Sequence, residues 1–123
     1  MTARCPCCRR ALPDVPVVSP HALRALAFAF VERETGLRPA VLRGRRTSHE
    51  ATRARALFVS IAKSFGGLDA SYSRIGAWLH KNHSSIRHLW LDLVPRLMAE
   101  DEDFATACGR FLEFAAQSRK AMP

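Results

Sequence analysis

The stretch SYSRIGAWLHKNHSSIRHLW, residues 71–90, carries the clearest structural signal in this chain. Apolar residues recur at helical spacing on both sides of a polar run, HKNHSS at residues 80–85. This run supplies histidine, lysine, asparagine and serine, and no Asp or Glu occurs between Ser71 and Leu91. A connection that only reversed the chain would not need so many hydrogen-bonding groups. The stretch predicts two short helices joined by a tight turn whose polar groups serve a second purpose.

The segments before this stretch predict two longer helices. Ser19 is a candidate N-cap, and Pro20 fits the first turn of a helix that Gly36 ends. The apolar face of this helix consists of Leu23, Leu26, Ala27, Phe30 and Val31. A short helical turn at residues 39–42 and a basic loop lead to a second long helix over about residues 50–64. Its expected core positions are Ala54, Leu57, Phe58, Ile61 and Phe65.

The segments around and after the polar run complete the helical pattern. Asp69 or Ser71 caps the first helix of the pair, and Pro95 ends or kinks the second. The acidic run EDED, residues 100–103, precedes a final helix, where carboxylates sit favourably at the N-terminal end of the dipole. No strand pattern competes with this assignment. We therefore expect an all-α fold, a compact bundle of about five to six helices.

Length and composition indicate one small, basic domain. We divide the 123 residues into a Cys- and Pro-rich arm (1–18), a helical domain (19–118) and a tail (119–123). Lys and Arg outnumber Asp and Glu by 19 to 11, giving a formal charge of +8 and a pI near 10.4. Sixteen of these cations are arginines, whose planar fork suits phosphates and guanine edges. Because no segment approaches about 18 consecutive apolar residues, a membrane partner is not expected.

The N-terminal arm raises the question of a metal. Its sequence, MTARCPCCRRALP, lacks the apolar stretch of a signal peptide, so we expect a cytoplasmic protein with reduced cysteines. Cys5 and Cys8 form a C-x-x-C pair resembling a zinc knuckle, which Cys7 or His21 could complete, or which two chains could share. No second C-x-x-C is present. Two alternatives stay open, zinc at this cluster or a metal-free arm, and no other cofactor is required.

The helix pair has the layout of a helix-turn-helix. In that layout the second helix enters the major groove, and its first turn carries compact hydrogen-bonding groups that approach base edges. The residues expected at DNA are Lys81, Asn82, His83, Ser84, Ser85, Arg87 and His88. Residues 38–55 hold six arginines against one acid, Glu50, and from this segment we expect contacts by Arg45, Arg46, Arg53 and Arg55. We assign Tyr72, Trp78 and Trp90 to the core rather than to stacking on single strands.

Residues 71–88, SYSRIGAWLHKNHSSIRH, resemble the signature of the C-terminal DNA-binding domain of the bacterial replication initiator DnaA. That signature reads S-x-x-x-I-G-x-x-F-G-G-x-D-H-(S/T)-(S/T)-V-x-H. The matching positions are Ser71, Ile75, Gly76, Leu79, His83, Ser84, Ser85, Ile86 and His88. The resemblance extends over roughly residues 19–118, because the order of first helix, arginine-rich loop and second long helix also fits.

This resemblance implies a fold like that of the DnaA DNA-binding domain and of Trp repressor. It also implies major-groove contacts by His83, Ser84 and Ser85 and a minor-groove contact by Arg45 or Arg46. The chain departs from the family pattern in its turn, which is one residue shorter and has His80 and Lys81 in place of glycines. Asn82 replaces the family's aspartate, and the initiator's nucleotide-binding loop, GxxxxGK followed by Ser or Thr, is missing from the sequence.

The sequence therefore predicts a double-stranded DNA-binding protein with sequence preference, acting as a transcription regulator and associated with the nucleoid when bound. One alternative is an origin-binding, replication or packaging accessory factor of a phage or mobile element. Another is a protein-interaction module with incidental DNA affinity, whose partner docks on the N-terminal arm or the acidic run. An enzyme is not expected, since neither a nucleophile motif nor a plausible carboxylate pair is found. The oligomeric state stays open.

Overall fold

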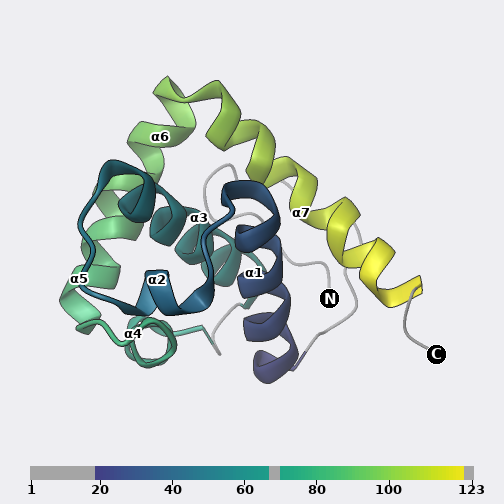
Figure 1. Cartoon of the computed structure of the whole chain (residues 1–123), viewed down its shortest axis with the longest axis horizontal. Helices are drawn as coiled ribbons and strands as arrows, with labels where there is room; N and C mark the ends of the chain where they lie inside the picture. The colour runs from purple at the N-terminus through teal and green to yellow at the C-terminus, as the bar shows by residue number, and fades with distance from the viewer. Residues whose placement is uncertain (1–18, 67–69, 121–123) are drawn as a thin grey trace.

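The computed structural model describes residues 19–66 and 70–120, with side chains as far as residue 117. These residues form no strand and fold into α1 (Pro20–Thr35), α2 (Pro39–Arg43), α3 (His49–Gly66), α4 (Tyr72–Leu79), α5 (His83–His88), the π-helical turn η2 (Leu89–Leu93), α6 (Val94–Glu100) and α7 (Glu102–Lys120) (Figure 1). The predicted all-α bundle is confirmed. The expected arm, residues 1–18, lies outside the described residues.

The ends of the first helix follow from local chemistry. The hydroxyl of Ser19 accepts a hydrogen bond from the Ala22 N–H (3.2 Å), which satisfies one of the N–H groups that a helix start leaves unpaired. Pro20 occupies the first turn. At the other end, Gly36 adopts a left-handed conformation with φ 75°, and its N–H donates to the Glu32 carbonyl at 2.7 Å. The bounds predicted for this helix are confirmed.

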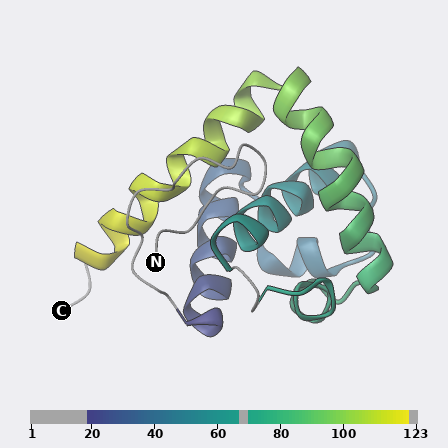
Figure 2. The ribbon, with the colours of Figure 1, turned by 180° about the vertical axis from the view of Figure 1, so that it is seen from behind.

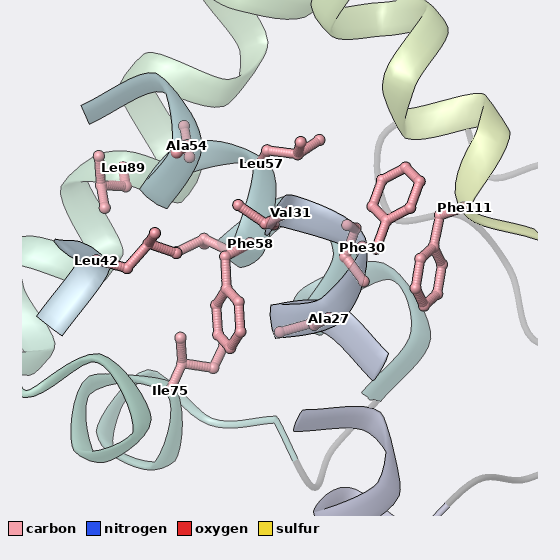
Figure 3. Close-up of a cluster of buried hydrophobic side chains, with 14 of the residues drawn as sticks. Ala27, Phe30, Val31, Leu42, Ala54, Leu57, Phe58, Ile75, Leu89 and Phe111 are labelled. Carbon is pink, nitrogen blue, oxygen red and sulfur yellow. The ribbon is translucent and has the colours of Figure 1, made fainter. Parts of the chain in front are cut away.

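Helix α3 is the centre of the bundle and contacts every other helix except α5 extensively. Its side chains from Ala54 to Ala62 are all buried, including Arg55 and Ser60. Figure 3 shows apolar side chains of α1, α2, α4 and α7 gathered around Leu57 and Phe58 of α3. This core fixes the position of both the basic segment and the helix pair, because α2 and α4 pack on α3 and Ile86 of α5 is buried in the same core.

The helical backbone runs without interruption from His83 to Glu100 through α5, η2 and α6. Within it, the Val94 N–H donates to the carbonyl of Leu89, five residues earlier, instead of the usual four. Pro95 follows immediately; proline lacks an N–H, and its ring collides with the carbonyl four residues before it. The widened turn accommodates this collision. Pro95 was predicted to end or kink the helix; the helix does not end there, and the turn before Pro95 is widened to a π turn.

The last helix begins at the acidic run, as predicted. Asp101 accepts a hydrogen bond from the Phe104 N–H at 3.0 Å, so its carboxylate caps α7. Helix α7 continues through Lys120, two residues beyond the end expected for the domain, residue 118. In Figures 1 and 2, α7 and α5 lie at opposite sides of the bundle.

Candidate nucleic-acid interface

The α4–α5 pair is built by two caps and one unusual backbone conformation. Ser71 caps α4 by accepting from the Arg74 N–H (3.1 Å), and Asn82 caps α5 by accepting from the Ser84 N–H (2.9 Å). Between them His80 adopts a left-handed conformation, with φ 54°, where the resemblance places glycine. Figures 1 and 2 show α4 end-on while α5 runs in the plane of the view, so the two helices cross steeply.

Gly76 allows this turn to lie against α4. Its carbonyl accepts from the Lys81 N–H at 2.8 Å. A methyl group at residue 76 would lie 2.6 Å from the Lys81 carbonyl oxygen, closer than carbon and oxygen can approach. The glycine in the sequence motif therefore has a packing reason, the close approach of the 80–82 backbone.

The first turns of α5 separate an apolar and a polar side. Ile86 and Leu89 are buried in the core. The predicted contact residues on the other side are exposed, namely Asn82, His83, Ser84, Ser85, Arg87 and His88. All six side chains end in short or planar groups that donate or accept hydrogen bonds, which suits an approach to base edges.

Arg55 of α3 fixes the position of the basic loop that follows α2. Its side chain is only 7% exposed, and its guanidinium donates to the carbonyls of Leu42 (2.9 Å), Val41 (3.1 Å) and Gly44 (3.1 Å). Burial lowers the pKa of this guanidinium. The sequence predicted Arg55 as a DNA contact; in the structure its guanidinium is turned inward onto these three carbonyls and positions the loop.

Two further cations connect the basic segment to the helix pair. Lys81 Nζ donates to the Gly44 carbonyl, which also accepts from Arg55. Arg43 Nε donates to the Trp78 carbonyl near the end of α4 at 2.9 Å, and its guanidinium stacks over Phe28. The loop after α2 is thereby fixed to α3, to α4 and to the 80–82 turn.

One surface groove brings predicted contact residues from three segments together. It lies between the basic loop, the first turns of α3 and the polar side of α5. Its lining residues are Arg45, Thr47, Thr52, Arg55, Lys81, Ser84, Ser85, His88 and Leu89. Arg46 is the exposed neighbour of Arg45, and no hydrogen bond or ion pair joins either side chain to another residue in the described part of the chain. Both guanidiniums are available to a ligand.

The groove is electropositive. Burial lowers the pKa of Lys81, because it disfavours the charged ammonium, and repulsion by the nearby Arg55 and Arg45 lowers this pKa further. The only carboxylate paired with a groove residue among those described is Asp92, whose Oδ2 lies 2.7 Å from Nδ1 of His88. An anion with several oxygens would relieve the repulsion among these cations.

Arg53 is not part of this groove. Its Nε donates to the Asp101 carboxylate at 2.8 Å, and its guanidinium lies over the Phe104 ring. The hydrogen bond from Arg53 lowers the pKa of Asp101, and the same bond raises the pKa of Arg53. Arg53 was expected at DNA together with Arg55; it lies on α3 and connects this helix to the start of α7.

Sequence reasoning missed several residues that shape this surface. Thr47 and Thr52 line the groove but carry no distinguishing sequence signal beyond their place in the basic segment. Arg43 has a partner 35 positions away, which no local pattern reveals. Leu91 and Asp92 follow shortly after residues 71–88, which carry the resemblance. Leu91 is exposed, and both residues line a second depression together with His83, Ser84, Arg87 and His88.

Other expectations have these outcomes. Tyr72, Trp78 and Trp90 are partly buried and pack against the core, as expected.

Cys5, Cys7 and Cys8 lie outside the described residues, so zinc there stays a prediction, and His21 is exposed on α1. Within residues 19–66 and 70–120, no cluster of three or more His, Cys, Asp or Glu is arranged to hold a metal. In the same ranges no helix combines the length and apolar character needed to cross a bilayer.

Comparison of the chain with protein-family models, with curated proteins and with solved structures found no match.

Proposed function

We propose that this protein binds double-stranded DNA with sequence preference, using α4 and α5 as a helix-turn-helix, and acts as a transcription regulator. The observation that carries the proposal is the groove that unites Arg45 of the basic loop, Lys81 of the turn, and Ser84, Ser85 and His88 of α5. Cations beside compact hydrogen-bonding groups suit a duplex, which presents phosphates next to base edges.

In this proposal α5 enters the major groove with its first turn leading. His83, Ser84, Ser85 and Arg87 approach base edges, while the buried Ile86 and Leu89 hold the helix on the core. Arg45 or Arg46 reaches the neighbouring minor groove or its phosphates. Lys81 contributes charge close to the backbone, and most of the affinity comes from phosphate contacts and counterion release.

The supporting geometry is the rigid connection between the loop and the reading helix. The Gly44 carbonyl accepts from both Arg55 and Lys81, so the segment carrying Arg45 has a fixed position relative to α5. A duplex contacted in two adjacent grooves requires such a fixed spacing, because the distance between its grooves is set by the DNA. Ordering the loop before binding also reduces the entropy lost on association.

The test is selection of bound sequences from a pool of random duplexes, followed by affinity measurements across a salt series. We expect a defined motif. Ser84→Ala should relax the preference at one position, since a good hydrogen-bonded base contact discriminates by about 1–3 kcal/mol. Arg46→Ala should weaken binding to all sequences and lower the slope of log affinity against log salt by about one.

Arg110→Ala is a control for net charge: it removes the same charge from α7, at the opposite side of the bundle from α5 (Figure 1), although it also breaks the ion pair between Arg110 Nη1 and Glu34 Oε2 (3.0 Å). It should retain the motif and most of the salt slope. If no motif is enriched and Ser84→Ala and Arg46→Ala both bind like the parent, the proposal is wrong. The location of the selected motif in a genome, at promoters or at a replication or packaging start, separates a regulator from an accessory factor.

A further inference from the structure

Leu91 lies on the polar side of the α5–η2 helix although it is apolar. It is 49% exposed, and Met98 is the only other large hydrophobic side chain left exposed in the described residues. Leu91 shares a surface depression with the candidate reading residues His83, Ser84, Arg87 and His88, and with Asp92. Unlike Met98, it is thus an apolar group within the proposed DNA-contacting surface.

Leu91 lies in the π turn η2, directly after α5. In an α-helix of about 3.6 residues per turn, residues spaced four apart, such as His83, Arg87 and Leu91, drift steadily around the axis. A π turn holds more residues, as the hydrogen bond from the Val94 N–H to the Leu89 carbonyl shows, so four residues then complete less than a turn. Leu91 lies within this π turn and lines the same depression as His83 and Arg87. Turns of this kind are frequent at functional sites.

The surroundings of Leu91 favour a base edge over a phosphate. The neighbouring Asp92 is exposed, and its Oδ2 lies 2.7 Å from Nδ1 of His88. A carboxylate at this place repels backbone phosphates, and Leu91 offers no hydrogen bond to them. An apolar side chain in the major groove instead packs against the C5-methyl of thymine, the one apolar group exposed on a base edge there.

We propose that Leu91 is a specificity-determining residue that contacts the C5-methyl group of a thymine in the major groove. This inference rests on the proposed function and adds to it one contact that lies two helical turns beyond the first turn of α5. In this arrangement Leu91 recognises an apolar group of a base, whereas the side chains of the first turn of α5 form hydrogen bonds.

The experiment replaces each thymine of the selected duplex, one at a time, by deoxyuridine, which lacks only the methyl group. We expect one or two positions at one side of the site where the parent loses about threefold to fivefold in affinity, as for one buried methyl group. At those positions the affinity of Leu91→Ala should be the same for the thymine duplex and for the deoxyuridine duplex, because the variant lacks the side chain that contacts the methyl group. Met98→Ala, the matched apolar control on α6, should respond like the parent.

Circular dichroism and the salt slope of Leu91→Ala should equal those of the parent, because the side chain is half-exposed and touches no phosphate. The inference is overturned if Leu91→Ala keeps the parent's sensitivity to deoxyuridine at every position, or if the parent shows no sensitivity at all. Failure of the proposed function gives a different result, since no motif would then be enriched before any thymine is replaced. In that case the inference falls with it.

Discussion

Arg55 provides the most demanding test of how the candidate interface is held together. Its buried guanidinium donates to three carbonyls of residues 41–44; the Gly44 carbonyl also accepts from Lys81, and the Val41 carbonyl also accepts from the Gly44 N–H. Arg55→Met keeps much of the side-chain volume but leaves the carbonyls of Val41 and Leu42 without this donor. Because the basic loop follows directly, we expect both stability and the order of the loop to decrease.

The magnitude follows from the bonds that are lost. A hydrogen bond to a charged group contributes about 1.5–3 kcal/mol, and three bonds from one guanidinium do not add in full. Removing the buried charge also relieves its desolvation, which offsets part of the loss. We expect the free energy of unfolding to fall by about 2–4 kcal/mol, equivalent to roughly 10–20 °C in Tm for a domain of this size.

The assay is urea unfolding followed by circular dichroism, with affinity for the selected duplex measured on the folded variant. Arg55→Lys keeps the charge, but its single ammonium cannot span three carbonyls, so it should lose most of the same stability. Arg46→Met removes the same charge from the surface and should stay within about 0.5 kcal/mol of the parent. An unfolding midpoint for Arg55→Met equal to that of Arg46→Met would refute this reasoning.

The remaining predictions concern the bundle. The folded state depresses the pKa of Asp101, so its contribution to stability is present above the unfolded pKa, about 3.9, and is lost as the pH falls through the folded pKa. Asp101→Asn should therefore be less stable than the parent at pH 6 in urea unfolding. Below about pH 5 its free energy of unfolding should depend less on pH than that of the parent. Equal pH dependence for the two proteins would contradict the pairing of Asp101 with Arg53. Gly76→Ala should destabilise by about 1–3 kcal/mol, because the added methyl group meets the Lys81 carbonyl. Gly109→Ala, which meets nothing within 4 Å on helix α7, should instead raise the Tm through the higher helix propensity of alanine.

Features encoded by neighbouring residues were predicted from the sequence. The cap at Ser19, the stop at Gly36 and the apolar periodicity of α3 each depend on residues within one or two turns, and Ser71 was one of two candidates for the cap of α4. The helix pair was predicted for the same reason. The widened turn before Pro95 was only partly predicted, since proline signals a distortion but does not say whether the helix ends or adapts.

The roles of the individual arginines could not be predicted. Six occur in residues 38–55, and sequence alone treats them as equivalent carriers of positive charge. Their partners are distant in the chain: 13 positions for Arg55 and Leu42, 35 for Arg43 and Trp78, and 48 for Arg53 and Asp101. Only the packing of α2, α4 and α7 around α3 brings these groups together, so only the fold separates arginines that support the structure from those exposed to a ligand.

This separation bears on how a basic segment gains selectivity. If all six arginines were exposed, the segment would bind phosphates in many arrangements, and its affinity would depend on charge more than on sequence. Here Arg43, Arg53 and Arg55 are engaged within the protein, while Arg45 and Arg46 extend from a loop that the Gly44 carbonyl fixes to α3 and to the turn. The inward-facing arginines thus restrict where the outward-facing ones can lie relative to α5. A change that frees the loop without altering the net charge, such as Arg55→Lys, should therefore reduce selectivity more than nonspecific affinity.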